Sequence, residues 1–254
     1  MEIGVCCSPT EAAGLPASAF DFIEVNVQNF LLPEKPDADF EPNLDLARAA
    51  VNPVKAANCF LPADLKCVGP TIDEARLLGY AETAFRRAAE VGIEIIVFGS
   101  GNARMSPPGY SLTQAMDDFV KVLRLVGPIA QRHGVTVVVE PLNSAECNLI
   151  TSLAEGAAAV GRCNHPNIRL LADYYHMLKD GEPATEIVRF GSLIKHTHIA
   201  ELAGRAPPGK SREDFTPFFQ ALEQIGYTGR VALECIWDNL EAELEPSMRY
   251  LRGA

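Results

Sequence analysis

The chain has 254 residues, of which 48% are hydrophobic and 22% are charged, as is ordinary for a soluble globular protein that buries its own core. Its formal net charge of −11 at pH 7 argues against nucleic acid and anionic membranes as main partners, because both attract basic surfaces.

Short apolar runs recur along the chain at fairly even intervals, and several of them are apolar throughout rather than alternating. This pattern is typical of parallel strands that are covered on both faces. Eight strands are expected, in chain order at residues 2–6, 21–27, 54–60, 93–99, 135–140, 168–173, 193–199 and 230–235.

Amphipathic stretches lie between these runs. Residues 73–91 place apolar side chains on one face at helical spacing, with Asp73 suited to the first turn and Gly92 to a C-terminal cap. Residues 113–132 show the same spacing. Further helices are expected at residues 44–51, 152–162, 183–190, 215–225 and 239–251.

Eightfold alternation of strand and helix within 254 residues is what a (β/α)8 barrel requires. A doubly wound open sheet usually has fewer strands and often a Gly-rich phosphate loop after the first one, and the segment CSPTEAAG does not match such a loop. No Pro/Gly/Ser-rich linker divides the chain. We therefore predict an α/β fold in one domain over residues 1–254, a (β/α)8 TIM barrel.

The N-terminal segment and the cysteines bear on the compartment. The second residue is an acid, which does not fit the start of a signal peptide. No segment approaches the ~20 apolar residues of a membrane span. The seven cysteines are scattered without C-x-x-C spacing, which favours small buried hydrophobic residues in a reducing compartment. We therefore expect a cytoplasmic protein.

Metal-capable side chains end the last four predicted strands. These side chains are Glu140, Asp173, His198 and Glu234. The carboxyl ends of the strands are where such barrels gather their catalytic groups. Because three carboxylates and an imidazole around one point are unfavourable without a cation, we predict a divalent-metal site with these four ligands.

Each of the four residues also has a simpler explanation when it is taken singly. A glutamate at a strand end can cap a helix or form a salt bridge, and Asp173 can cap the helix that follows it. His196, in the segment KHTHI, is interpreted as a hydrogen-bonded core residue. The occurrence on four successive strands favours a metal. The oxygen-rich set suits Mn²⁺ best, with Mg²⁺, Co²⁺ and Zn²⁺ as alternatives.

The segments EPLNSAECN, DYYHM, HTHIAE and GRVALE resemble the signature segments of the xylose-isomerase-like TIM-barrel superfamily. The resemblance is closest to its sugar isomerase/epimerase branch, which includes ketose 3-epimerases and hydroxypyruvate isomerases. It spans the whole chain, with the specific motifs in the second half. It implies the same four metal ligands, a small carbohydrate substrate, and a homo-oligomer (a dimer or a tetramer).

The resemblance also implies residues that bind substrate near the metal. Glu146, after EPLN, and His176, from the D-x-x-H motif, would contact substrate hydroxyls, and Arg205 would match a substrate-binding arginine. The chain departs from the family pattern at Ser144, where members often have Arg, and in ELAGR, which is one residue longer than E-x-N-R. His176 could instead support a metal ligand.

The predicted site suits removal of a proton from a carbon next to a carbonyl. A metal would chelate the carbonyl and a neighbouring hydroxyl and stabilise the developing enediolate. Glu140 and Glu234 are the predicted acid/base pair, because strands five and eight approach the substrate from different sides. Return of the proton to the same carbon gives epimerisation, and return to the adjacent carbon gives isomerisation.

Three other functions compete with an isomerase or epimerase. A metal-dependent lyase or dehydratase acting on a keto-sugar or keto-polyol would use the same enolate, and the sequence does not separate the two. A DNA-repair endonuclease of this fold needs further histidines on strands three and four. A non-catalytic sugar-binding barrel would not need two carboxylates on the metal. Polar residues at other strand ends, Glu24, Asn26 and Asn58, are expected to reach sugar hydroxyls or to pack in the core.

Overall fold

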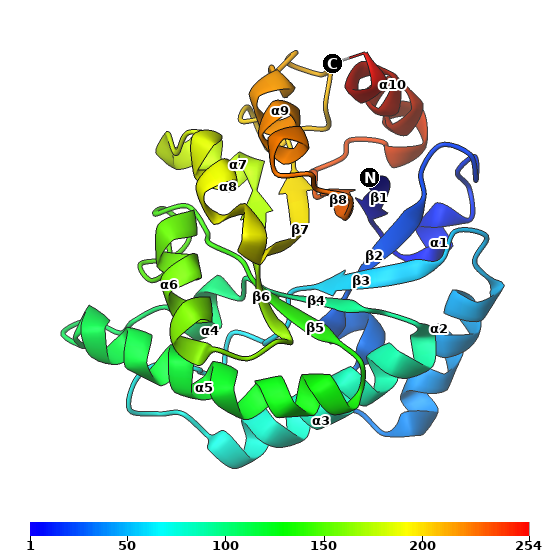
Figure 1. Cartoon of the computed structure of the whole chain (residues 1–254). Helices are drawn as coiled ribbons and strands as arrows, with labels where there is room; N and C mark the ends of the chain where they lie inside the picture. The colour runs from blue at the N-terminus through cyan, green and yellow to red at the C-terminus, as the bar shows by residue number, and fades with distance from the viewer. Residues whose placement is uncertain (254) are drawn as a thin grey trace.

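Eight strands alternate with helices along residues 1–253, the part of the chain that the computed structural model describes. The strands are β1 Glu2–Cys6, β2 Phe22–Asn26, β3 Val54–Asn58, β4 Ile95–Phe98, β5 Thr136–Val139, β6 Ile168–Asp173, β7 Ile194–Ile199 and β8 Arg230–Leu233. Each pairs in parallel with its neighbours in sequence, and β1 pairs with β8, so the sheet closes into a barrel (Figure 1). The predicted (β/α)8 fold is confirmed, and every strand lies within its predicted range.

Helices surround the barrel on its outer side (Figure 1). The α-helices are α1 Pro9–Ala12, α2 Asp37–Ala49, α3 Glu74–Val91, α4 Gly101–Arg104, α5 Leu112–Arg132, α6 Leu153–Cys163, α7 Tyr174–Asp180, α8 Thr185–Phe190, α9 Thr216–Gln224 and α10 Leu240–Arg252. A π-helix, Val27–Leu31, follows β2, and a 3-10 helix, Gly191–Leu193, precedes β7. Among the helices of residues 1–253, none is both long enough and apolar enough to cross a membrane.

The helices with a clear amphipathic pattern begin and end close to their predicted positions. Asp73 caps α3 by accepting a hydrogen bond from the backbone N–H of Arg76 at 3.0 Å, and Gly92 ends the helix with a φ of +94°. The pattern missed the first turns of α2, because Asp37 and Asp39 there are polar and exposed. It also missed α7, which begins directly after β6.

Apolar side chains form one layer between the strands and the helices and a second, smaller cluster inside the barrel. The inner cluster consists of Phe22, Ala56, Ile95, Val97, Val138, Leu171 and Ala232. Phe22 fills its place so closely that a Cβ atom at Gly4 would lie 2.4 Å from the phenyl ring. Only glycine fits at that point of β1 without a shift of the ring. The barrel interior is therefore a packed core.

Candidate metal centre

The four predicted metal ligands lie together at the carboxyl ends of the last four strands. Glu140 and Glu234 directly follow β5 and β8, Asp173 ends β6, and His198 lies on β7. The pairing register of β6 and β7 places Asp173 beside His198. Each of the four side chains offers one ligand atom, and these atoms all lie within 4.8 Å of one another. The structure thus brings together the whole set that the strand ends predicted.

The two carboxylate oxygens of Asp173 have different roles. Oδ1 caps α7 by accepting hydrogen bonds from the backbone N–H groups of Tyr175 at 2.7 Å and His176 at 3.3 Å. Oδ2 is buried and has no hydrogen-bond partner within residues 1–253. A buried carboxylate oxygen without a partner is costly. Asp173 therefore caps the helix with one oxygen and presents the other to the cluster.

The imidazole of His198 is fully buried and lies in the middle of the cluster. Its Nδ1 atom lies 3.2 Å from Glu140 Oε1, 3.3 Å from Glu234 Oε2 and 4.0 Å from Asp173 Oδ2. Its Nε2 atom lies 2.8 Å from Glu24 Oε1. A carboxylate that accepts a hydrogen bond from Nε2 leaves the Nδ1 lone pair for another partner, which is the usual arrangement of a metal-bound histidine.

Glu24, on β2, was expected to reach sugar hydroxyls or to pack in the core, and the structure supports the second role. Its side chain is buried, and its Oε1 and Oε2 atoms are occupied by the Nε2 atoms of His198 and His196, the latter at 2.7 Å. His196 is thus the hydrogen-bonded core residue that the sequence indicated. The sequence carried a signal for Glu24 as well, because an acid on an otherwise apolar strand requires a buried partner.

Replacement of Glu24 by Gln is expected to weaken Mn²⁺ binding by about 10–100-fold, because a neutral amide orients the His198 ring less strongly. Calorimetric titration of the folded variant with Mn²⁺ measures this effect. The matched control is Glu94→Gln, which removes an exposed carboxylate that pairs with Arg230 at 2.8 Å. An affinity equal to that of the parent protein would show that Glu24 does not position His198.

The electrostatics of the cluster favour a positive charge at its centre. Burial alone would lower the pKa of His198, but Glu24 and Glu234 outweigh burial and raise that pKa well above its usual value. Burial also favours the neutral form of Glu234, yet His198 and Arg205 lower its pKa well below the usual range. Burial raises the pKa of Glu140 despite its hydrogen bond with His198. The carboxylates of Glu24 and Glu234 therefore stabilise a positive charge placed beside them.

A divalent cation fits this arrangement. Three carboxylates and one imidazole form a hard, oxygen-rich donor set, and Asp173 Oδ2, which has no hydrogen-bond partner among residues 1–253, lies 4.0 Å from His198 Nδ1. Cys6, Glu24 and His198 form a second group with similarly close ligand atoms. That second group is already satisfied, because Glu24 and His198 Nε2 bond to each other and burial raises the pKa of the Cys6 thiol well above its usual value.

His176 and Glu146, the two residues implied to bind substrate, flank the cluster and share Asn143 as a partner. The Nδ1 atom of His176 accepts a hydrogen bond from the backbone N–H of Asn143 at 3.2 Å, so Nε2 carries the ring proton. This Nε2 atom is buried, lies 3.6 Å from Asp173 Oδ2 and finds no hydrogen-bond partner in the described part of the chain. Glu146 is partly exposed and accepts a hydrogen bond from Asn143 Nδ2 at 2.8 Å.

Arg205 reaches the cluster from the loop that follows β7. Its guanidinium group contacts Glu234 Oε2, lies 3.7 Å from Asp173 Oδ2 and lies over the Tyr175 ring at 4.8 Å from the centroid. The guanidinium therefore balances part of the negative charge of the predicted metal ligands. It borders the site and is already paired with carboxylates.

Two residues from neighbouring strands, which the sequence reasoning did not assign to this role, support the carboxylates. Asn58, at the end of β3, donates a hydrogen bond from Nδ2 to Glu234 Oε1 at 3.0 Å. Gly99, directly after β4, leaves room for Glu140, because a Cβ atom there would lie 2.0 Å from Glu140 Oε2. A cavity of about 320 Å³ opens beside these groups, and the predicted site residues that line it are Glu140, Glu146, His176, Arg205 and Glu234.

Comparison with known protein families identifies the family to which this barrel belongs. A family model described as xylose isomerase-like TIM barrel matches residues 19–254, which is most of the chain. The chain belongs to this family. The family resemblance of the strand-end motifs is thereby confirmed.

The relatives of this xylose isomerase-like chain include named epimerases. The L-ribulose 3-epimerase of Methylomonas sp. is 28% identical over 149 residues, which cover 52% of this chain and about half, 52%, of that relative. The 3-dehydro-D-guloside 4-epimerase of Escherichia coli is 29% identical over 201 residues, which cover 72% of this chain and 76% of the relative. The structure of a D-allulose 3-epimerase from Methylomonas sp. in complex with D-allulose has a TM-score of 0.82 at 21% identity, covering 100% of this chain and 96% of that one. This structural likeness shows the shared fold.

Proposed function

We propose that this xylose isomerase-like protein is a divalent-metal-dependent sugar epimerase or isomerase that moves a proton on a carbon next to a carbonyl. The observation that carries the proposal is the placement of two carboxylates, Glu140 and Glu234, around one buried imidazole and beside one cavity. The four-residue cluster that suits a cation supports it. The names of the two relatives, both epimerases, support it as well.

The four ligands and the acid/base pair would share the same side chains. Glu140, Asp173, His198 and Glu234 would hold the ion, for which Mn²⁺ is the best match and Mg²⁺, Co²⁺ and Zn²⁺ are alternatives. When bound, the ion would polarise the substrate carbonyl and stabilise the negative charge that develops on its oxygen. In the closed barrel β6 and β7 lie between β5 and β8, and this separation supports the proposal that Glu140 and Glu234 approach the substrate from different sides. One carboxylate removes the proton, and the other returns a proton to the opposite face.

The flanking residues would orient the substrate. His176 has a buried Nε2–H group that lacks a partner within residues 1–253, and we assign it as a donor to a substrate oxygen. Glu146 and Arg205 line the same cavity and would bind hydroxyl groups. Asn58 holds the carboxylate of Glu234 in place through its hydrogen bond. A sugar held at several hydroxyls presents its reacting carbon in one orientation, which is what stereospecific proton transfer requires.

Incubation of the Mn²⁺-loaded protein in D2O with a panel of ketoses, aldoses and small hydroxycarbonyl compounds is expected to place deuterium on the carbon next to the carbonyl. NMR spectroscopy of the products identifies the reaction. A deuterated epimer indicates an epimerase, an aldose–ketose change indicates an isomerase, and loss of water or another leaving group indicates the rival lyase. Absence of exchange with every compound would refute proton transfer as the activity of this site.

A further inference from the structure

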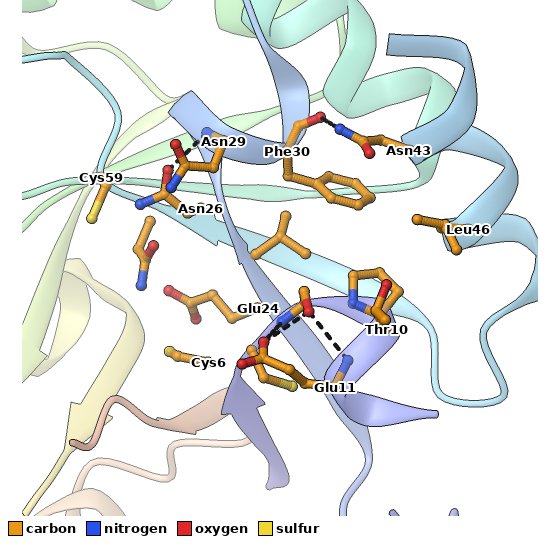
Figure 2. Close-up of a pocket in the computed structure, with 15 residues that line it drawn as sticks. Cys6, Thr10, Glu11, Glu24, Asn26, Asn29, Phe30, Asn43, Leu46 and Cys59 are labelled. Carbon is orange, nitrogen blue, oxygen red and sulfur yellow. Dashed lines mark hydrogen bonds between the residues drawn. The ribbon is translucent and has the colours of Figure 1, made fainter. Parts of the chain in front are cut away.

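A second cavity of about 420 Å³ lies beside the candidate metal centre, at the carboxyl ends of β1, β2 and β3 (Figure 2). We call it the β1–β3 cavity, and its walls include Cys6, Glu11, Asn26, Asn29, Phe30 and Asn43. Its volume lies within the range of about 300–1,000 Å³ that is typical of small-molecule sites. It therefore offers room for a part of the substrate beyond the reacting carbons.

The β1–β3 cavity and the metal centre share walls. Glu24 lines the cavity and bonds His198 with Oε1 at 2.8 Å. Asn58 lines the cavity and bonds Glu234 with Nδ2 at 3.0 Å. Cys59 lines both this cavity and the cavity of about 320 Å³ at the metal centre. A substrate whose carbonyl lies at the metal centre can therefore extend into the β1–β3 cavity.

Among the residues that line this cavity, the charged side chains are acidic. They are Glu11 and Glu24, and the lining contains no Lys, Arg or His. Both carboxylates are engaged: Glu11 accepts hydrogen bonds from the backbone N–H of Ser8 at 2.8 Å and from its hydroxyl at 2.7 Å, and Glu24 bonds the two buried histidines. A phosphate or carboxylate placed here would face the carboxylate of Glu11, and the lining offers it no Lys, Arg or His as a partner.

Carboxamide groups provide the polar contacts of the cavity. Asn26 accepts the backbone N–H of Asn29 with Oδ1 at 3.0 Å, which leaves its Nδ2 group as a donor. Asn43 donates from Nδ2 to the carbonyl of Phe30 at 2.8 Å, which leaves its Oδ1 atom as an acceptor. Within residues 1–253 the side chain of Asn29 makes no hydrogen bond of its own. A mixture of neutral donors and acceptors matches hydroxyl groups, which both donate and accept.

The lining also contains apolar side chains. Figure 2 shows Phe30 and Leu46 on one side of the cavity, with Asn26 and Cys59 on the other. Burial raises the pKa values of the Cys7 and Cys59 thiols to about 12, so these side chains are neutral at physiological pH. Apolar side chains and neutral polar groups together suit a sugar, which presents both C–H groups and hydroxyls.

We propose that the β1–β3 cavity binds the uncharged polyol part of the substrate, so that the protein selects a neutral keto sugar over one that carries a phosphate or a carboxylate at that end. This assignment rests on the proposed function, because it places the carbonyl at the metal centre. Arg205 does not offset the acidic lining, because it lies at the other cavity and is paired with Glu234 and Asp173.

The test compares a free ketohexose with its terminal phosphate ester, using the Mn²⁺-loaded protein and equilibrium dialysis. The parent protein is expected to bind the free ketose about tenfold or more tightly than the ester. Asn29→Lys, which adds a positive charge to the lining, is expected to narrow this ratio about tenfold. Thr10→Lys adds the charge from α1 on another wall and is an independent second variant. Gln131→Lys, an exposed position near the end of α5, is the matched control and should leave the ratio unchanged.

Equal or tighter binding of the ester by the parent protein would overturn the proposal. An unchanged ratio in both cavity variants would overturn it too, as would a parent protein that binds neither compound. These binding constants do not depend on turnover. Loss of deuterium exchange with a retained preference for the free ketose therefore refutes the proposed reaction alone. Exchange with a reversed preference refutes the assigned substrate class alone.

Discussion

Glu140→Gln and Glu234→Gln are each expected to lower the rate of deuterium exchange by about 10²–10⁴-fold at saturating Mn²⁺. A glutamine has nearly the shape of glutamate but cannot accept and return a proton at neutral pH. Each glutamine can still bond the imidazole of His198, which Glu140 and Glu234 approach at 3.2 and 3.3 Å. The fold should therefore survive while proton transfer fails. Exchange rates by NMR, with circular dichroism for the fold, measure both quantities.

The matched control for these variants is Glu223→Gln, because Glu223 is exposed on α9, away from the cluster. It should exchange deuterium at the parent rate. The saturating Mn²⁺ concentration separates loss of proton transfer from loss of metal affinity, since both glutamates are also predicted ligands. Parent-like turnover in both site variants would remove their acid/base roles.

Removal of divalent metal by a chelator is expected to abolish exchange and to lower the thermal unfolding temperature. At a Mn²⁺ concentration of 100 times Kd, binding to the folded state adds about 2.7 kcal/mol. For a chain of this size that corresponds to a rise of about 5–10 °C in Tm. The physical source of the effect is the cluster itself, in which the Oδ2 atom of Asp173 lacks a hydrogen-bond partner among the described residues. Differential scanning calorimetry with and without Mn²⁺ measures the shift.

Asp173→Asn tests how much the charge of this one carboxylate contributes to metal binding. The amide oxygen can still cap α7, because Oδ1 accepts the N–H groups of Tyr175 and His176, but the charge offered to the cation is lost. We expect most of the Mn²⁺-dependent rise in Tm to disappear. Asp39→Asn, at an exposed position in the first turn of α2, should retain the full rise. A metal-free protein with the Tm and exchange rate of the Mn²⁺-loaded one would contradict a metal centre at this position.

Local patterns were enough to predict the barrel and the cluster of ligands. Apolar runs at regular intervals identified all eight strands, and a closed parallel barrel necessarily gathers its strand ends at one rim. Glu140, Asp173, His198 and Glu234 could therefore be grouped without any knowledge of distances. The helix starts that were missed, in α2 and α7, lie where the turns are polar or directly follow a strand, so the apolar periodicity does not register them.

The partners of the ligands could not be predicted in this way. Glu24 and His196 are separated by 172 residues, and Asn58 and Glu234 by 176. The sequence predicted only that Glu24 and Asn58 reach sugar hydroxyls or pack in the core. Whether such a residue faces a ligand, a histidine or a substrate depends on the register between strands and on which neighbour already satisfies it.

The sequence by itself determined the order of the strands and the residues at their ends, because both follow from hydrophobic periodicity along a continuous chain. The tertiary structure alone decided that Glu24 bonds two imidazoles, that Gly99 leaves room for Glu140, and that the residues lining the β1–β3 cavity include no Lys, Arg or His. These facts depend on distances of a few ångströms between segments far apart in the chain, and only closure of the barrel sets such distances.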